Sequence, residues 1–412
     1  MILAAEWIFP VTSPPIRWGV VEIAEGFIQS IRPGDETVSA RGVCLLPGLV
    51  NVHTHLAYTS LRNRFDHLEF FPWIRKLTEA KYQQLTEQDI AESTGLGINE
   101  CLRAGITTVA DLSDLEISLK VLSTSPLNAI FYWEVFGVEA EQAEQTWQDL
   151  QKNFPRFQKK YATPKLKVGV SPHACYTVRP ELYSRIAEWA LREKIPVSFH
   201  LAESKMEEEF IAKRSGVIYD FIQQRTSDWR ISANSSISHL EDTGIFHTSP
   251  LLAHLVQAGA GDLEILKKYN ITVAHCPKSN AKFGHGIAPI YEMLESGFIV
   301  GIGTDSAASN NRLDLFEEAR FALLQQRCRA GKMVMTEQQM LEMITIRGAE
   351  AMGLQDRIGS LEVGKQADLI AVQVPSYYKD DQQVLNHLIY NTTGSDVSRT
   401  IISGQEVFAL NR

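Results

Sequence analysis

Two histidines with a single residue between them are the first feature of this 412-residue chain that could do chemistry. His53 and His55 follow the apolar pair Leu45–Leu46 and the turn Pro47–Gly48. On an extended strand, residues two apart point to the same face, so these two imidazoles could bind one cation together. Neutral imidazole suits zinc and also iron. A pair of polar residues at the end of a strand is the competing interpretation, and the motif alone does not decide between the two.

A histidine and a glutamate follow another strand-like run. His200 comes after residues 197–199 and could be a third ligand, and Glu203 lies three positions later. If burial raises the pKa of Glu203, its carboxyl could give a proton to a ring nitrogen or to a leaving group. The competing interpretation makes Glu203 the N-cap of the next helix, with the acidic residues 207–209 forming a solvated face.

An aspartate and three more histidines extend this set of candidates. Asp305 ends an apolar run and could be a carboxylate ligand that also takes a proton from a bound water. The competing interpretation makes Asp305 the N-cap of a helix. It is disfavoured because the next expected helix begins several residues further along the sequence. His254 also ends an apolar run and could orient an attacking hydroxide and stabilise an oxyanion. His275 could support the site or satisfy buried backbone, and His173 could touch a substrate. Surface or structural roles are expected for His67, His239, His247, His285 and His387.

The elements that must position these side chains alternate between helix and strand over residues 46–355. Thr86 and Asp89 have the spacing of a helix start, and the expected helix runs to Arg103. A β-branched run follows and ends at Asp111, and a second helix is expected to begin at Pro180. Repeated strand–helix units imply a parallel sheet. In a (β/α)8 barrel, such strand ends converge on one mouth, where catalytic groups sit.

The two ends of the chain have the pattern of short strands instead. Residues 20–31 predict a hairpin that turns at Glu25–Gly26, and residues 400–408 predict another that turns at residues 403–405. These β-rich ends could pair with each other as one small sheet domain.

Composition excludes several classes of protein. With 40 basic and 49 acidic residues the net charge is −9, which disfavours a nucleic-acid-binding surface. A 44% apolar content excludes wholesale disorder, and no run reaches the ~18 apolar residues of a membrane helix. The five scattered cysteines do not make a disulfide framework, and the N-terminus has no basic region typical of a secretory signal. We therefore expect a cytoplasmic protein.

Taken together, the motifs resemble those of the amidohydrolase superfamily. They run in the family's order from about residue 5 to residue 408. They are similar to the branch that holds the S-adenosylhomocysteine/methylthioadenosine deaminases, the aminodeoxyfutalosine deaminases and the triazine chlorohydrolases. The motifs are Pro47-Gly48-Leu49-Val50-Asn51-x-His53-x-His55, His200-x-x-Glu203, His275-Cys276-Pro277-x-Ser279-Asn280, Gly303-Thr304-Asp305-x-Ala307-Ala308-Ser309-Asn310-Asn311 and Gly359-Ser360-Leu361-Glu362-x-Gly364-Lys365-x-Ala367-Asp368-Leu369.

The resemblance implies an α/β fold, a (β/α)8 TIM barrel with a small β-sandwich domain built from both termini. The expected domains are residues 1–45 and 356–412 for the sandwich and 46–355 for the barrel. The resemblance also implies one divalent metal ion, with zinc preferred and iron or manganese as alternatives, because the segment 168–173 lacks the bridging lysine of two-metal relatives. The implied metal ligands are His53, His55, His200 and Asp305.

The catalytic groups implied are Glu203, His254 and Asp305, with His254 preferred to His275 for its place along the chain. His173 and Trp73 are expected to contact the substrate. The segment 70–74 around Trp73 is expected to be a lid element over the mouth; a helix packed on the barrel is the competing interpretation, and the two are compatible.

The expected activity is hydrolytic deamination of an adenine-type nucleoside with release of ammonia. Such a substrate would be aminodeoxyfutalosine-like or S-adenosylhomocysteine/methylthioadenosine-like. Hydrolysis of another nitrogen heterocycle, as by a chlorohydrolase or an amidohydrolase, is the alternative within enzymes. A non-catalytic barrel scaffold is the alternative outside them. The expected partners are a small heterocyclic substrate and a second copy of the chain in a homodimer, with no nucleic acid and no membrane.

Overall fold

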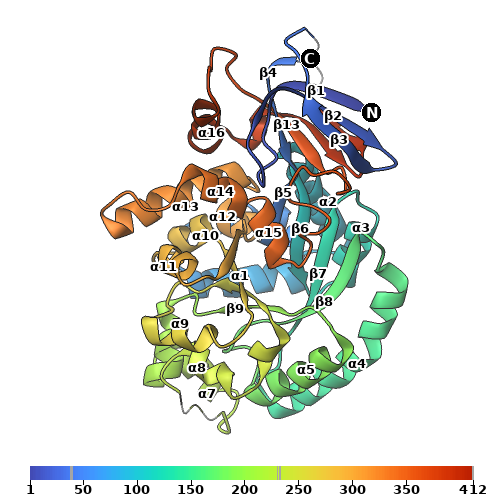
Figure 1. Cartoon of the computed structure of the whole chain (residues 1–412). Helices are drawn as coiled ribbons and strands as arrows, with labels where there is room; N and C mark the ends of the chain where they lie inside the picture. The colour runs from blue at the N-terminus through green and yellow to red at the C-terminus, as the bar shows by residue number, and fades with distance from the viewer. Residues whose placement is uncertain (38–39, 230, 232, 411–412) are drawn as a thin grey trace.

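Two four-stranded parallel sheets form the barrel at the centre of the computed structural model, which describes residues 1–37, 40–229, 231 and 233–410 (Figure 1). One sheet has the order β5-β6-β7-β8 and the other β12-β11-β10-β9. Their strands are β5 (Leu49–Thr54), β6 (Ile106–Ser113), β7 (Asn128–Val135), β8 (Leu166–Pro172), β9 (Ser198–Leu201), β10 (Leu251–His254), β11 (Thr272–His275) and β12 (Ile299–Ile302).

The two sheets meet along both of their edges. Isolated parallel bridges between Val170 and Val197 and between Ala174 and His200 join β8 to β9. On the other side, the backbone N–H of Asp305, just after β12, donates to the carbonyl oxygen of His53 in β5 at 2.9 Å. The expected TIM barrel is therefore confirmed, and both seams run through residues singled out from the sequence.

Helices follow the strands and cover the barrel. The predicted helix with the Thr86–Asp89 capping box begins at Glu87 and ends at Arg103, and the helix predicted from Pro180 ends at Glu193. None of the described helices is long and apolar enough to cross a membrane. The helices are α1 (Phe70–Glu79), α2 (Glu87–Arg103), α3 (Glu116–Ser123), α4 (Ala140–Tyr161), α5 (Pro180–Glu193), α6 (Lys205–Glu208), α7 (Val217–Gln223), α8 (Ser236–Glu241), α9 (Ala260–Leu266), α10 (Pro277–Lys282), α11 (Ile290–Glu295), α12 (Ala307–Asn310), α13 (Leu315–Ala330), α14 (Glu337–Met343), α15 (Ile346–Ala351) and α16 (Asp381–Tyr390).

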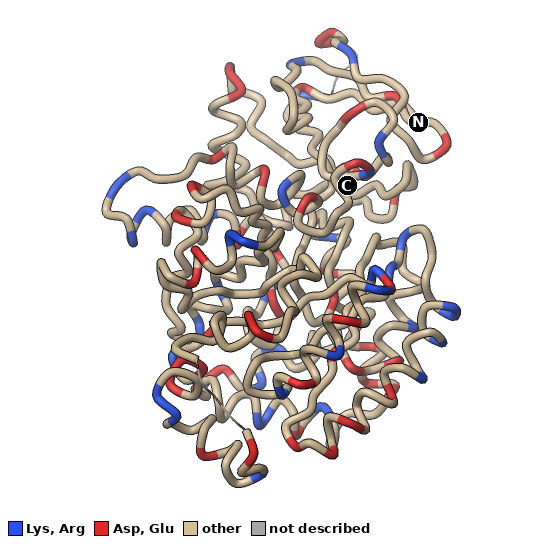
Figure 2. The backbone as a smooth tube through the Cα atoms, turned by 60° about the horizontal axis from the view of Figure 1, so that its bottom comes forward, with Lys and Arg blue, Asp and Glu red and all other residues tan. Residues whose placement is uncertain are grey.

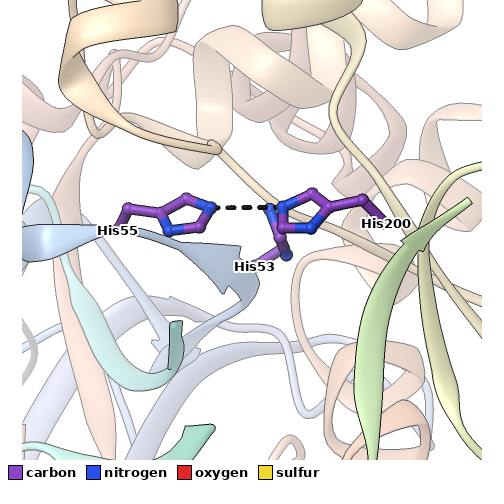
Figure 3. A group of neighbouring side chains, drawn as sticks. All are labelled: His53, His55 and His200. Atoms are coloured by element: carbon purple, nitrogen blue, oxygen red, sulfur yellow. Dashed lines mark hydrogen bonds between the residues drawn. The ribbon is translucent and has the colours of Figure 1, made fainter. Parts of the chain in front are cut away.

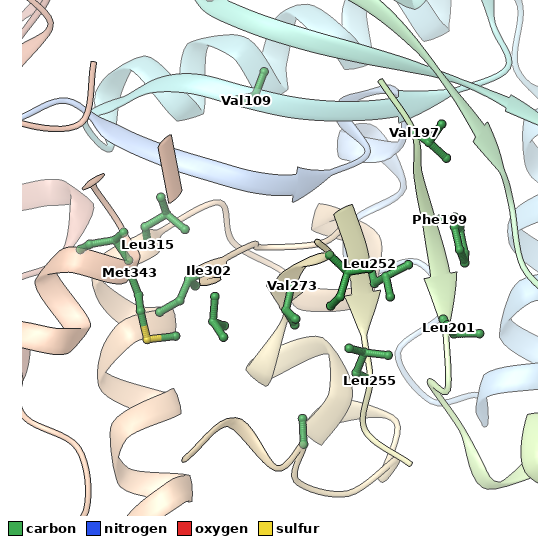
Figure 4. Close-up of a cluster of buried hydrophobic side chains, with 14 of the residues drawn as sticks. Val109, Val197, Phe199, Leu201, Leu252, Leu255, Val273, Ile302, Leu315 and Met343 are labelled. Atoms are coloured by element: carbon green, nitrogen blue, oxygen red, sulfur yellow. The ribbon is translucent and has the colours of Figure 1, made fainter. Parts of the chain in front are cut away.

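The largest buried cluster lies between the strands and these helices. It includes Phe199 and Leu201 of β9, Leu315 of α13 and Met343 of α14 (Figure 4). Because side chains alternate between the two faces of a strand, packing Phe199 and Leu201 against the helices turns His200 to the opposite face. The hydrophobic pattern of β9 thus directs this histidine toward the barrel interior.

Strands from both termini form one seven-stranded sheet in the order β15-β14-β13-β4-β1-β2-β3. Both predicted hairpins are present, as the antiparallel pairs β2–β3 and β14–β15. The turns of these hairpins touch, since a Cβ added at Gly404 would lie 3.2 Å from the Cα of Gly26. The sheet therefore curls around its own apolar core. Its strands are β1 (Ile2–Ile8), β2 (Ile16–Ala24), β3 (Phe27–Pro33), β4 (Ala40–Pro47), β13 (Leu369–Gln373), β14 (Val397–Ile402) and β15 (Gln405–Ala409).

The terminal sheet and the barrel are closely joined. Strand β4 extends across residues 45 and 46, and α16 of the C-terminal segment packs against α13 and α14 at the side of the barrel (Figure 1). The division at residues 45 and 355 stays a prediction. Acidic and basic residues are interspersed along the chain (Figure 2).

Candidate metal and catalytic site

Three histidine side chains converge inside the barrel (Figure 3). His53 belongs to β5, His55 follows its end, and His200 belongs to β9 of the opposite sheet. One nitrogen from each ring lies within 4.8 Å of the others, and the Nε2 atoms of His55 and His200 are 3.4 Å apart. A tetrahedral ion with ligands at about 2.1 Å separates ligand atoms by about 3.4 Å, so the spacing suits one metal ion.

Asp305 brings a carboxylate to the same point. Its Oδ1 lies 3.7 Å from Nε2 of His53 and 3.6 Å from Nε2 of His55. Both ring nitrogens of His53 are buried and lack a hydrogen-bond partner within the described chain. An unpaired buried polar atom is costly, and a bound cation would remove that cost for the nitrogen that faces Asp305. Three imidazoles and one carboxylate form a donor set that fits a divalent ion such as zinc.

Hydrogen bonds orient two of the histidines for metal binding. The Nδ1 of His55 lies 3.0 Å from the carbonyl oxygen of Leu112, and the Nδ1 of His200 lies 2.8 Å from that of His173. A carbonyl accepts a proton, so each Nδ1 carries the hydrogen and each Nε2 keeps its lone pair for a ligand. Burial lowers the pKa of His55. Burial, together with the close approach of the His55 and His254 imidazoles, lowers the pKa of His200 to about 3. Both rings are therefore neutral.

The carboxylate of Asp305 is held from the other side. Its Oδ2 accepts hydrogen bonds from the hydroxyls of Ser279 at 2.6 Å and Ser309 at 2.8 Å. Burial by itself would raise the pKa of Asp305, but the neighbouring imidazoles of His55 and His254 and the hydrogen bond from Ser279 hold it below its usual value. Asp305 is thus ionised. The helix expected near residue 313 is α13, and its N-cap is Asp314, while Ser306 caps the short helix α12.

Glu203 and His254 lie together beside this cluster. The Oε1 of Glu203 is 3.7 Å from Nε2 of His254, and both side chains are buried. Burial raises the pKa of Glu203 well above its usual value, and the negative charges of Asp305 and Glu207 add to the effect. The Nδ1 of His254 lies 2.9 Å from Oδ1 of Asn280, and burial lowers the pKa of the ring. Burial therefore favours the protonated form of the Glu203 carboxyl and the neutral form of the His254 imidazole.

Left-handed backbone occurs at three of the strand ends that carry the site. The φ angles are +51° at Ala202, +76° at His254 and +56° at Asp305. Such conformations cost roughly 1–3 kcal/mol each for residues other than glycine, and they persist only where the surroundings hold them. In a regular β10 strand, the side chains of residues 252 and 254 would point to the same face, and Leu252 packs in the outer core. The left-handed conformation at His254 breaks this alternation, so its side chain need not follow Leu252.

The competing interpretation of residues 207–209 as a solvated face is wrong for Glu207. Its side chain is fully buried, and its two oxygens accept the backbone N–H groups of Ala202 at 2.8 Å and Glu203 at 2.9 Å. Ser204, not Glu203, caps α6. Glu207 therefore holds the loop that carries Glu203, a role that its acidic neighbours concealed in the sequence.

His173 lies at the edge of the site. Its ring centroid is 4.7 Å from that of His200 and 4.9 Å from that of Phe136, and it is only partly buried. Its Nδ1 is 2.9 Å from the hydroxyl of Thr177. His173 therefore adjoins a metal ligand and keeps part of its surface exposed.

Trp73 lies further from the metal ligands. It belongs to α1, which the structure shows as a helix packed on the barrel, and its ring is 4.8 Å from that of Phe283. The neighbouring Phe70 packs edge-on against His285 at 4.5 Å. Trp73 thus belongs to an aromatic wall beside Glu203 rather than to the metal cluster.

Sequence reasoning missed or misplaced several side chains that line this region. His285, expected at the surface or in a structural role, is buried with Nε2 3.6 Å from Oε1 of Glu203. Tyr58 stacks on His55 with ring centroids 5.6 Å apart, and Glu134 approaches Nδ1 of His55 to 4.0 Å. His275 is buried, and no hydrogen bond reaches its ring nitrogens from the part of the chain that the structure describes. The weak signal for Tyr58 was its place three residues after His55.

Comparison with known proteins places these features in a family. The family described as the amidohydrolase family matches residues 44–407. The 5'-deoxyadenosine deaminase of Methanosarcina acetivorans is 34% identical over 398 residues, which cover 95% of this chain and 88% of the relative. The 5-methylthioadenosine/S-adenosylhomocysteine deaminase of Bacillus cytotoxicus is 31% identical, with 94% and 87% covered.

Solved structures agree with the fold. A zinc-bound adenosine deaminase from Xanthomonas campestris has a TM-score of 0.86 and 25% identity, with 99% of this chain and 92% of that chain covered. The aminofutalosine deaminase of Helicobacter pylori has a TM-score of 0.82 and 23% identity, with 99% and 100% covered. Together with the convergent histidines, the zinc-bound structure supports a single divalent metal ion, zinc.

Proposed function

Since this chain belongs to the amidohydrolase family and is a hydrolase of C–N bonds, we propose that it deaminates an adenine-type nucleoside and releases ammonia. The observation that carries the proposal is Glu203, a carboxyl that burial keeps protonated, next to a three-histidine, one-aspartate donor set. Removal of an exocyclic amine requires both an activated water and a proton for the ring. The deaminases among the relatives support the same reaction class.

We propose that four residues hold the metal ion: His53, His55, His200 and Asp305. A divalent ion bound there supplies Lewis acidity, which lowers the pKa of a water toward ~7. The neutral rings and the ionised aspartate are the protonation states that such an ion requires.

The remaining chemistry falls to Asp305, His254 and Glu203. Asp305 takes one proton from the attacking water, and Glu203 gives its proton to the ring nitrogen next to the amino-bearing carbon. His254 presents the lone pair of Nε2 and orients the water. Asp305 then passes its proton to the amino group, the C–N bond breaks, and ammonia leaves. Glu203 recovers a proton from the new hydroxyl, which leaves a 6-oxo product.

The part of the nucleoside that is attached to the base is expected to reach the edge of the site. His173 would contact it through its ring, and Trp73 would supply an apolar surface. A 5'-deoxyadenosine-like, methylthioadenosine-like, S-adenosylhomocysteine-like or aminodeoxyfutalosine-like substrate satisfies this description, and the relatives favour this group.

Ammonia release from a nucleoside panel tests the proposal. We expect the zinc-loaded protein to release ammonia from at least one adenine-type nucleoside and to lose this activity on chelation, with recovery when zinc is restored. Chloride release from a chlorotriazine without ammonia release from any nucleoside would point to the chlorohydrolase alternative. A protein that neither binds zinc, iron or manganese nor releases ammonia would be a scaffold, contrary to the proposal.

Variants separate the two proton-transfer roles from metal binding. Glu203→Gln keeps the shape of the side chain but removes the acid, so turnover should fall by about 10²–10⁴ while metal content stays at one ion per chain. Asp305→Ala should lower both turnover and metal content, measured by mass spectrometry of the metal. Wild-type turnover in either variant would refute its assigned role.

A homodimer and a cytoplasmic location complete the proposed function. Light scattering coupled to size-exclusion chromatography tests the dimer, and fractionation of source cells tests the location.

A further inference from the structure

A buried histidine outside the proposed catalytic set faces the same carboxyl oxygen as His254. His285 is 4% exposed, and its Nε2 lies 3.6 Å from Oε1 of Glu203. The Nε2 of His254 lies 3.7 Å from this oxygen. Within the described residues, Nε2 of His285 has no hydrogen-bond partner, although the atom is buried. Glu203 is the group that could satisfy it.

The ring of His285 is held in place from several directions. Its backbone N–H donates to the carbonyl oxygen of Asn280 at 2.9 Å, and its carbonyl oxygen accepts from the side chain of Gln257 at 2.6 Å. Phe70 of α1 packs edge-on against the ring at 4.5 Å, and the ring of Phe283 lies 5.7 Å away. Fixing a polar ring in this way gives its free nitrogen a defined direction.

The hydrogen bonds of the neighbouring residues assign a donor role to His285. The Oδ1 of Asn280 accepts from Nδ1 of His254, so a neutral His254 turns a lone pair, not a proton, toward Oε1 of Glu203. A lone pair cannot donate to a carboxyl oxygen, and it could accept from Oε1 only if that oxygen carried the acidic proton. His285 is then the side chain on the other flank of Oε1 that can donate to it. A distance of 3.6 Å is longer than a hydrogen bond, and such contacts at catalytic groups tighten in the substrate complex.

We propose that His285 is a positioning residue for Glu203. Its Nε2–H donates to Oε1 of the neutral carboxyl, which keeps the acidic proton on Oε2 and directs that oxygen to the ring nitrogen of the substrate. Asn280 couples the two histidines, because its side chain fixes His254 and its backbone fixes His285. The assignment rests on the proposed function, since it gives His285 a part in the proton transfer by Glu203.

Steady-state kinetics of two variants test the proposal. His285→Leu removes the donor, and we expect kcat to fall by about 10²-fold with KM nearly unchanged, because a misplaced reacting group costs roughly that factor. His285→Gln restores an N–H donor and should recover part of the loss. His247→Gln, a change at an exposed histidine outside the site, is the matched control and should keep wild-type kinetics. Full activity in His285→Leu, or a higher KM with unchanged kcat, would overturn the proposal.

Nuclear magnetic resonance gives a readout that needs no substrate. In zinc-loaded protein with ¹⁵N-labelled histidine, the signals of His285 are assigned by their loss in His285→Gln. We expect Nε2 of His285 to be protonated, and its N–H signal to be lost to faster exchange with water in Glu203→Ala. An unprotonated Nε2, or a signal that Glu203→Ala leaves unchanged, contradicts the proposal. This result stands even if no nucleoside in the panel proves to be a substrate, and so separates this proposal from the proposed function.

Discussion

Replacement of Glu207 by alanine should weaken both the fold and the site. The change removes the acceptor for two buried backbone N–H groups, those of Ala202 and Glu203, at 2.8 and 2.9 Å. A hydrogen bond to a charged group contributes about 1.5–3 kcal/mol, so the free energy of unfolding should fall by about 3–6 kcal/mol. A typical domain has about 5–15 kcal/mol in total, so this is a large fraction. The left-handed backbone at Ala202 also loses its restraint.

Glu207→Gln is the milder form of the same perturbation. It keeps one acceptor oxygen and places an amide N–H against the other backbone donor, so we expect a loss of about 1.5–3 kcal/mol. Its turnover should also fall, because Glu203 is one of the two residues whose backbone Glu207 holds. Urea unfolding of zinc-saturated protein, followed by tryptophan fluorescence, measures the stability, and ammonia release measures the activity.

Glu209→Ala is the matched control for Glu207→Ala. Glu209 is two residues away, is partly exposed and forms an ion pair with Lys213, so its loss should cost at most about 1 kcal/mol. Equal urea midpoints for the two variants would refute the role given to the buried carboxylate. If Glu207→Gln is destabilised but fully active, the stabilising role of Glu207 stands and only its effect on activity through Glu203 is refuted.

Two further predictions concern a glycine next to a metal ligand and a buried acid. A Cβ at Gly303 would lie 2.7 Å from Cβ of His53 and 2.9 Å from its carbonyl oxygen, so Gly303→Ala should displace His53 and lower zinc affinity, measured by competition with a chelating dye. Gly261→Ala, where the added Cβ meets nothing within 4 Å, should leave zinc affinity unchanged; equal affinities in both variants would contradict the first expectation. Burial raises the pKa of Glu318 from 4.5 to about 8, so the folded state binds the proton more tightly and loses stability as pH rises between these values. Glu318→Gln cannot lose that proton, so its urea midpoint should fall less than the wild-type midpoint between pH 5 and pH 8.5, and parallel curves would count against the assignment.

Much of the fold followed from local pattern. The capping box at Thr86 sets one helix start because its side chains accept hydrogen bonds from backbone N–H groups of the first turn. The proline at residue 180 sets another because it lacks a backbone N–H where the first turn has no partner for one. Both signals are local and do not depend on the rest of the chain. The hairpins at both termini followed from alternating apolar residues around short turns. What these patterns could not predict was the order of the strands, because the two hairpins lie at opposite edges of one seven-stranded sheet that long-range hydrogen bonds hold together.

The sequence by itself determined which residue types could form a metal site, since His53 lies in a strand, His55 just follows it, and His200 and Asp305 lie at or after the ends of other strands. Only the tertiary structure decided which groups surround Glu203. The buried carboxylate of Glu207 lies in an acidic run that looks solvated, and His285 reaches Glu203 from 82 positions away in the chain, through the fold of the barrel. Burial and proton state depend on neighbours that are close in space and distant in sequence, and so they cannot be derived from residue spacing.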